Sequence, residues 1–176
     1  MSENAAPSLQ DDDFRLFGLP QRFALDLDDL DRRWKALQRQ VHPDRFAAQG
    51  AAAQRVAMQW SVRVNEAYNR LRQPLKRAAY CCELRGAAIE AESNTTMPAA
   101  FMLQQMEWRE ALDEAATESE LDILYQQTRQ ARQAGLDRLA DLLDVQGDAP
   151  AAAQQVRALM FVDRFADEVR KRIERL

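Results

Sequence analysis

The stretch "RQVHPDRF", residues 39–46, holds the only histidine of the 176-residue chain, followed at once by proline and aspartate. The residue before a proline is pushed out of the α region, so we expect a helix to end near Val41. Pro43 fixes the backbone and lacks an N–H donor, and this presents His42 and Asp44 on a stiff, exposed connection. A single histidine cannot build a metal site by itself, so this stretch alone predicts no metal centre.

Apolar residues on both sides of this connection recur at steps of three and four, which is typical of helices with one buried face. Before the connection these residues are Leu27, Leu30, Trp34, Leu37 and Val41. After the connection they are Ala53, Val56, Trp60, Val64, Ala67 and Leu71. Asp26 is the expected N-cap of the first helix. The two helices should pair antiparallel, with the connection exposed at one end of the pair.

Two short elements flank the helix pair. The stretch "DFRLFGLP", residues 13–20, is apolar and should stop at its glycine and proline. On the other side, a helix should open at Pro74 and close before Gly86. With the pair, these elements define one all-helical module, residues 11–85. The start of the chain, "MSENAAPSLQDDD", is acidic and polar, and we expect residues 1–10 to form a flexible tail.

The rest of the chain predicts a second all-helical module. Residues 86–97, "GAAIEAESNTTM", have no apolar period and are expected to be a linker. Residues 98–176 contain three longer helices, the first to about residue 116 and the second to about Val145, and these should pack as a three-helix bundle. Thr117 and Glu120 make a capping-box signature between the first and second of them. The last helix has an apolar stripe of Leu159, Val162, Ala166, Val169, Ile173 and Leu176.

One glycine in this module has no explanation in the sequence. Gly135 lies inside the second helix, where glycine costs about 1 kcal/mol relative to alanine.

The composition predicts a hydrated surface around a packed core, with 47% hydrophobic and 30% charged residues. No apolar run approaches the roughly 18 residues of a membrane span, and the acidic start is unlike a secretory signal. We therefore expect a cytoplasmic protein that has no membrane partner. Its length has room for one ordinary domain or two small ones. Residues 11–85 carry 14 Lys or Arg against 10 Asp or Glu, whereas residues 86–176 carry 10 against 17. The resulting excess of +4 in the front half is too small to predict nucleic acid binding.

Two sets of residues invite a chemical interpretation. Cys81 and Cys82 are adjacent, and without a CxxC pattern they are better interpreted as small buried hydrophobes than as a reactive or metal-ligating pair. His42 as a catalyst would need a nucleophile, a pocket or a second titrating group in reach. Asp44 is close, but there is no glycine-rich phosphate loop and no cluster of metal ligands. We expect no catalytic residue, no metal and no cofactor; the remaining alternative is that Asp44 merely caps a turn.

"HPD" between two antiparallel helices, followed by "RF" and by "VNEAYNRL" in the next helix, resembles the J-domain, the module that activates DnaK-type ATPase chaperones. The resemblance covers about residues 11–83. It implies that the "HPD" residues engage the chaperone and stimulate its ATP hydrolysis; these are His42, Pro43 and Asp44. On the preceding helix one basic face is formed by Arg32, Lys35 and Arg39. Alone, such a face is ordinarily a solvated surface; beside "HPD" we expect it to dock on the chaperone.

The residues after the J-domain-like part indicate which kind of J-protein the chain resembles. The glycine/phenylalanine region and zinc-binding repeats of general J-proteins are missing, and a helical bundle follows instead. "FGLP", "HPDRF" and "AAFMLQQMEWREALDE" are similar to the HscB family over nearly the whole chain. This resemblance implies a co-chaperone of iron–sulfur cluster assembly whose bundle binds an IscU-type scaffold and delivers it to an HscA-type chaperone. The other open alternative is a J-domain fused to an unrelated helical module for another client.

The same resemblance implies which bundle residues bind the scaffold. They are Met102, Leu103, Met106, Glu107, Glu110 and Phe161. Independently, Met102 and Met106 stand four apart and Phe161 lies off the main stripe of its helix, so they are able to form an exposed apolar patch. Methionines that simply fill the core are the alternative. The residues assigned to the core by spacing are Phe101, Trp108 and Leu112. Nothing in the sequence demands more than a monomer.

Overall fold

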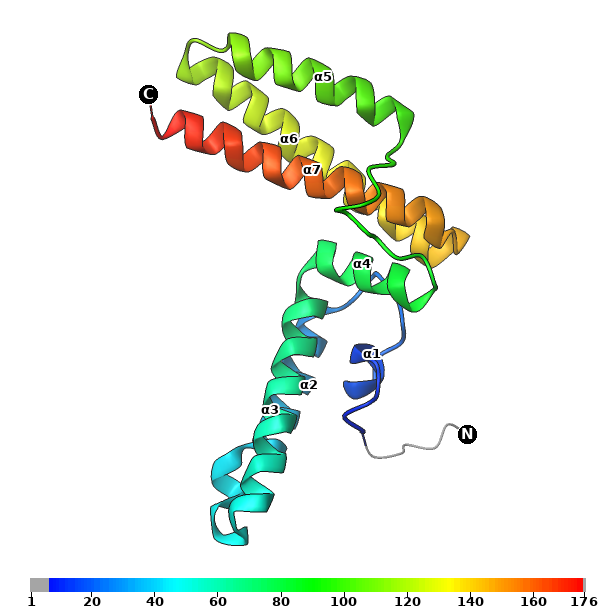
Figure 1. The fold of residues 1–176 in the computed structure, drawn as a ribbon, viewed down its shortest axis with the longest axis vertical. Coiled ribbons are helices and arrows are strands. Elements are labelled where there is room, and N and C mark those ends of the chain that lie inside the picture. Colours follow the sequence, from blue (N-terminus) through cyan, green and yellow to red (C-terminus); the bar gives the residue numbers. More distant parts are fainter. Residues whose placement is uncertain (1–6, 176) are drawn as a thin grey trace. The chain divides into compact units, whose positions relative to one another are not determined.

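The computed structural model describes residues 7–175, and these residues form helices and turns but no strand (Figure 1). Residues 1–6 of the expected tail and Leu176 of the last apolar stripe lie outside this range. No helix within the described range is long and apolar enough to cross a membrane. The all-helical class expected from the sequence is confirmed.

The first of two compact units contains the predicted helix pair. Its elements are α1 (Asp13–Leu16), α2 (Leu27–Val41), a 3₁₀ helix η1 (Pro43–Gln49) and α3 (Ala51–Arg72). Asp26 caps α2 as expected, because its Oδ1 accepts hydrogen bonds from the backbone N–H groups of Asp28 at 2.9 Å and Asp29 at 3.1 Å. His42 closes α2 with an extended backbone (φ −61°, ψ 128°), as the following proline requires.

The antiparallel pairing of α2 with α3 is secured by a set of aromatic and polar contacts. The Trp34 ring stacks on the Tyr68 ring with centroids 4.4 Å apart, and the indole N–H donates to Asn65 Oδ1 at 3.0 Å. The Tyr68 hydroxyl donates to Asp31 Oδ1 at 2.5 Å, and this bond raises the pKa of Tyr68 above its ordinary value. Residues earlier in α2 thus contact residues later in α3, which fixes the register of the pair.

α1 is anchored to α3 by a buried carboxylate. The Asp13 side chain is fully buried and pairs with Arg63 at 2.8 Å and with Arg70 at 2.9 Å, both on α3. Arg63 also donates to the backbone carbonyls of Leu9 at 3.3 Å and Asp11 at 2.7 Å. Residues 7–10 of the expected tail are therefore held, at Leu9, to the helix pair.

Two residues of the predicted buried stripes are exposed, and those two assignments were wrong. Leu27 is 46% exposed and Val56 is 51% exposed, whereas Leu30 and Val64 of the same stripes are fully buried. Leu27 is the first residue of α2, and Val56 lies two turns before Arg63, where the contacts with α1 begin. Helical periodicity gives the direction of a stripe but not how far a neighbouring helix covers it.

The second unit contains the bundle. Its helices are α5 (Ala99–Glu114), α6 (Glu118–Ala140), a π-helix η2 (Asp141–Gln146) and α7 (Ala149–Ile173). The units divide between Arg77 and Ala78, inside α4 (Pro74–Leu84), whereas the sequence pattern placed the module boundary after residue 85. The predicted helix to Val145 changes at Asp141 from α to π geometry.

Both cysteines lie in the part of α4 that belongs to this unit. Cys81 and Cys82 are buried and form no disulfide, which confirms their interpretation as small buried residues. Burial raises the pKa of the Cys82 thiol to about 11.

The predicted capping box and the unexplained glycine both have structural roles in α6. Thr117 Oγ1 accepts from the Glu120 backbone N–H at 3.3 Å, and Glu120 Oε2 accepts from the Thr117 N–H at 3.0 Å. Gly135 lies where α6 meets α7, and a Cβ at this position would be 2.5 Å from Leu159 Cδ2. Glycine therefore permits a close approach of the two helices that alanine would obstruct.

An aromatic cluster joins α5 to α7. Trp108 is 4% exposed and stacks on Phe165 with ring centroids 5.5 Å apart, which confirms its place in the core. Phe101 and Leu112, also assigned to the core, are half-buried. The Phe101 and Trp108 rings meet edge to face, with their centroids 6.2 Å apart.

Candidate functional site

The "HPD" stretch forms the joint between α2 and η1. His42 Nδ1 accepts a hydrogen bond from the Asp44 backbone N–H at 3.3 Å and lies 3.5 Å from Asp44 Oδ2. Pro43 occupies the first position of η1, where its missing N–H costs nothing. The His42 side chain is 55% exposed and that of Asp44 is 90% exposed. The joint thus presents an imidazole and a carboxylate to solvent on a backbone of fixed direction.

A residue that the sequence did not single out braces this joint. Arg45 Nη1 donates to the backbone carbonyl of Arg39 at 3.0 Å, so η1 is tied back to the last turn of α2. Arg45 is the first residue of the "RF" that follows "HPD" in the sequence. That its side chain folds back onto the end of α2 follows only from the structure.

The basic face of α2 is exposed as expected, and its three cations are not equivalent. Arg32 donates to Asp29 Oδ1 at 3.1 Å, so its charge is partly compensated. Arg33 donates to the other oxygen of Asp29 at 2.8 Å and, with Arg32, lowers the pKa of that carboxyl. Lys35 and Arg39 pair with no carboxylate in residues 7–175 and carry most of the net charge of this face.

On α5, the predicted apolar residues point away from the core. Met102 is 57% exposed, Leu103 is 66% exposed and Met106 is 70% exposed. Glu107 and Glu110 are exposed beside them, and the 3.6-residue period places all five on one face of the helix. The alternative that these methionines fill the core is therefore wrong. An apolar cluster of this kind, rimmed by charge, is typical of a protein-binding surface.

Part of this face opens into a groove of about 640 Å³. Met102 and Met106 form its α5 side, and Phe161 of α7 is half-buried within it. Phe161 is held between Phe101, at 5.7 Å, and Phe165, at 5.9 Å between ring centroids. The structure thus brings Met102, Met106 and Phe161 together, and the other three predicted residues lie beside the groove on the outer face of α5.

Arg109 completes this region. Its guanidinium lies over the Phe161 ring at 5.4 Å and over the Phe165 ring at 5.2 Å, and it pairs with Glu168. Cation–π contact with two rings stabilises the aromatic side of the groove. Spacing alone did not identify Arg109, because its partners are on another helix.

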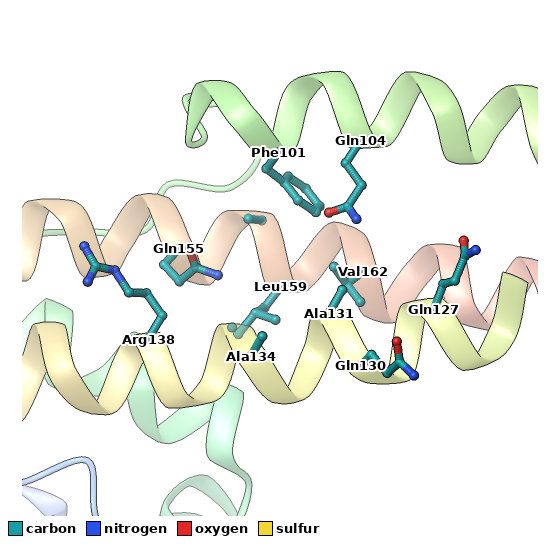
Figure 2. A pocket seen from close by; sticks show the side chains of 12 residues that line it. Phe101, Gln104, Gln127, Gln130, Ala131, Ala134, Arg138, Gln155, Leu159 and Val162 are labelled. Carbon is teal, nitrogen blue, oxygen red and sulfur yellow. The ribbon is translucent and has the colours of Figure 1, made fainter.

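A second groove, of about 510 Å³, lies between α5 and the α6–α7 pair (Figure 2). Amide side chains from all three helices surround it, and Arg138 is its one ionisable lining residue. Its apolar floor is provided by Leu159 and Val162. Within residues 7–175, no group of three or more His, Cys, Asp or Glu side chains is placed to hold a metal ion.

Known proteins resemble the chain over nearly its full length. Residues 97–170 match the family model described as the HSCB C-terminal oligomerisation domain. The co-chaperone protein HscB homologue of Burkholderia multivorans is 54% identical over 172 residues, which cover 96% of this chain and 98% of that protein. The chaperone HscB from Vibrio cholerae has a TM-score of 0.78 at 32% identity, covering 94% of this chain and 99% of that one. Human co-chaperone protein HscB has a TM-score of 0.86 at 26% identity, covering 97% and 86%. The chain belongs to the HscB family of co-chaperones.

Proposed function

We propose that the protein is an adaptor in iron–sulfur cluster assembly, with one surface for a chaperone and one for its client. The J-domain, residues 11–85, stimulates ATP hydrolysis by an HscA-type, DnaK-like chaperone in the bacterial cytoplasm. The bundle, residues 98–176, binds an IscU-type scaffold protein and delivers it to that chaperone. Residues 86–97 link the two. The observation that carries this proposal is the pair of exposed surfaces, at "HPD" and on α5, in a member of the HscB family.

The chaperone surface acts through the joint between α2 and η1. Because His42 Nδ1 accepts the Asp44 N–H, the neutral imidazole carries its proton on Nε2, which is the nitrogen left for a partner. The exposed Asp44 carboxylate is able to accept a charge-assisted hydrogen bond from an arginine of the chaperone. Pro43 holds the two groups in place, so little conformational entropy is lost when the chaperone binds.

The basic face of α2 contributes to the encounter with the chaperone. Arg32, Lys35 and Arg39 attract an acidic surface, and such charges mainly raise the association rate. Lys35 and Arg39 should matter more than Arg32, since Asp29 already compensates part of the Arg32 charge.

The scaffold surface combines apolar contact with a negative rim. Met102, Leu103 and Met106 bury apolar area against the scaffold, and the half-buried Phe161 provides a rigid aromatic wall. Glu107 and Glu110 favour Lys or Arg on the scaffold. Because both proteins bind the same adaptor, the client is held at high effective concentration beside the chaperone, and two modest affinities act together.

The decisive experiment is the steady-state ATPase of an HscA-type chaperone, measured with and without an IscU-type scaffold. Wild type with scaffold should stimulate strongly, and His42→Gln should lose most of this stimulation. Equal stimulation with and without the scaffold would support the J-domain role but would show that the bundle binds another client. If this protein alone converted a substrate, with no chaperone present, it would be an enzyme and the adaptor proposal would be wrong. The monomeric state stays a prediction, which sedimentation equilibrium would test.

A further inference from the structure

We propose that the linker forms part of the scaffold-binding surface: Thr95 and Met97 make one wall of the groove, and Arg157 of α7 positions that wall. This inference rests on the proposed role of the bundle and extends it to residues outside α5 and α7. The sequence pattern marked residues 86–97 only as a connection without an apolar period. In the structure, Thr95 and Met97 line the same groove as Met102, Met106 and Phe161.

Arg157 holds the linker at two places. Its Nε donates to the Thr96 carbonyl at 2.6 Å, and its Nη1 donates to the Ile89 carbonyl at 3.0 Å. The residue is 5% exposed, and within residues 7–175 it pairs with no carboxylate. A buried guanidinium is costly unless its donors are satisfied, so these two carbonyls are what make its burial tolerable. Ile89 is itself 5% exposed, which fixes the first end of the linker by packing.

The segment that faces the groove is also held from its other side. Asn94 Oδ1 accepts from the Thr96 backbone N–H at 3.0 Å, so the backbone N–H and the backbone carbonyl of Thr96 both have partners. Gln105 of α5 donates to Met97 Sδ at 3.1 Å. Thus Arg157 fixes the backbone from α7, while Gln105 fixes the Met97 side chain from α5. The wall is preorganised, and preorganisation reduces the entropy lost when a partner binds.

The groove suits an apolar anchor of the scaffold with basic residues around it. Thioethers and aromatic rings provide its walls, and methionine adapts its shape to the group it contacts. The charged residue in the lining, Arg109, is paired with Glu168, so its charge is compensated. Glu107 and Glu110 on the adjoining face of α5 are exposed and give the surroundings of the groove a negative charge. The groove is continuous with the exposed face of α5, because Met102 and Met106 belong to both. One occupant, the scaffold, therefore covers both surfaces.

The test of the wall is the affinity of the full-length protein for an IscU-type scaffold, measured by titration calorimetry. Met97→Ala should weaken binding about tenfold, the effect of losing one well-packed interface contact. Met58→Ala is the matched control, because Met58 is 55% exposed on α3 and should leave the affinity unchanged. Met106→Ala separates the two proposals. A loss for Met106→Ala but none for Met97→Ala would overturn the linker wall alone; no loss for either would overturn the scaffold-binding surface.

The test of the positioning role is Arg157→Met, which keeps an apolar side chain of similar length but removes every donor. It should weaken scaffold binding about as much as Met97→Ala, and the double variant should lose little more, because both act on one wall. Stimulation of the chaperone without scaffold should not change. Faster hydrogen exchange at the Thr96 amide should accompany the loss. Additive losses, or exchange that is faster throughout α7 as well, would show a general destabilisation and overturn the positioning role.

Discussion

His42 belongs to two helices, since it closes α2 and precedes the first residue of η1. Its Nδ1 serves the backbone by accepting the Asp44 N–H, and its Nε2 is left for a partner. These two roles are separable, because asparagine also accepts a backbone N–H at the start of a helix but does not extend to the position of Nε2.

His42→Asn should therefore keep the fold and lose the function. We expect the free energy of unfolding to change by less than about 0.5 kcal/mol, as is usual for an exposed position. Stimulation of the chaperone ATPase should fall at least about tenfold, which corresponds to about 1.4 kcal/mol of lost transition-state stabilisation. Urea unfolding and steady-state ATPase measure the two quantities. Gln40→Ala, two residues earlier on the exposed surface of α2, is the control. Full stimulation by His42→Asn would contradict the role of Nε2.

Gly135 is a second position at which a single added carbon atom should change the stability of the protein. A methyl group there gains about 1 kcal/mol of helix propensity but lies 2.5 Å from Leu159 Cδ2, and overpacking costs about 1–3 kcal/mol. Gly135→Ala should therefore lower the free energy of unfolding by about 1 kcal/mol in chemical denaturation. In the Leu159→Ala background the two Leu159 atoms are gone and only the flexible end of Gln155, whose Nε2 lies 2.9 Å from the new Cβ, has to move. The same change should therefore cost much less there or be neutral. An equal loss in both backgrounds would show that the contact is not the cause.

At the scale of the element, the start of α6 has a titrating cap. The Ala116 N–H, the Thr117 hydroxyl and the Thr117 N–H donate to Glu120, and these bonds lower the pKa of its carboxyl from the ordinary 4.5. Because the pKa is lower in the folded state, the charged cap stabilises the bundle above the unfolded-state pKa. That contribution is lost as the pH falls through the folded-state pKa.

Glu120→Gln should accordingly lower the melting temperature at pH 7, and this difference should shrink at about pH 3, because the charged cap loses its contribution as the pH falls towards the lowered pKa. Thermal unfolding followed by circular dichroism at the two pH values measures this difference. Glu118→Gln is the control, since Glu118 lies in the same first turn without forming the capping box. A melting difference that persists unchanged at pH 3 would show that the charge of Glu120 is not what matters.

Features that depend on neighbours in sequence were predictable. The cap at Asp26, the helix end before Pro43 and the box at Thr117 each follow from a few adjacent residues, and each is confirmed. Features that depend on distant contacts were not. The exposure of Leu27 and Val56 depends on how far a neighbouring helix covers each stripe, and the reason for Gly135 is a side chain of α7. The change to π geometry after Ala140 had no signal in the apolar spacing either.

The candidate site divides in the same way. The exposed joint and the outward face of α5 follow from a motif and a period. Arg45, Arg109 and Arg157 were missed, because an arginine in a sequence gives no sign of the carbonyl or ring that its long side chain reaches. The roles of the predicted site residues stay predictions until the variants are measured.

At the scale of the whole molecule, the charge is divided between the two ends of the chain. Residues 11–85 have a net charge of +4, and residues 86–176 have a net charge of −7. Both proposed surfaces carry the sign of their own half, basic at α2 and acidic at α5. Association with an acidic chaperone and a basic scaffold should therefore depend on ionic strength at both surfaces.

Raising the ionic strength from about 0.05 M to about 0.5 M should increase several-fold the protein concentration that half-saturates ATPase stimulation. A Lys35→Gln/Arg39→Gln double variant should have a higher half-saturating concentration than the wild type at low salt, and this concentration should change less when salt is added. Arg55→Gln removes an exposed cation from α3 instead and should behave like the wild type. Equal salt dependence in all three proteins would contradict docking through the basic face of α2.

The buried thiols of α4 have a consequence for the cargo itself. Iron is captured by thiolate, not by thiol, and burial raises the pKa of the Cys82 thiol to about 11, so this side chain stays protonated at neutral pH. Cys81 is closed to solvent as well. In the proposed role beside a cluster scaffold, these thiols are not presented to the metal as ligands, so the cysteines of this protein should not draw iron away from the scaffold.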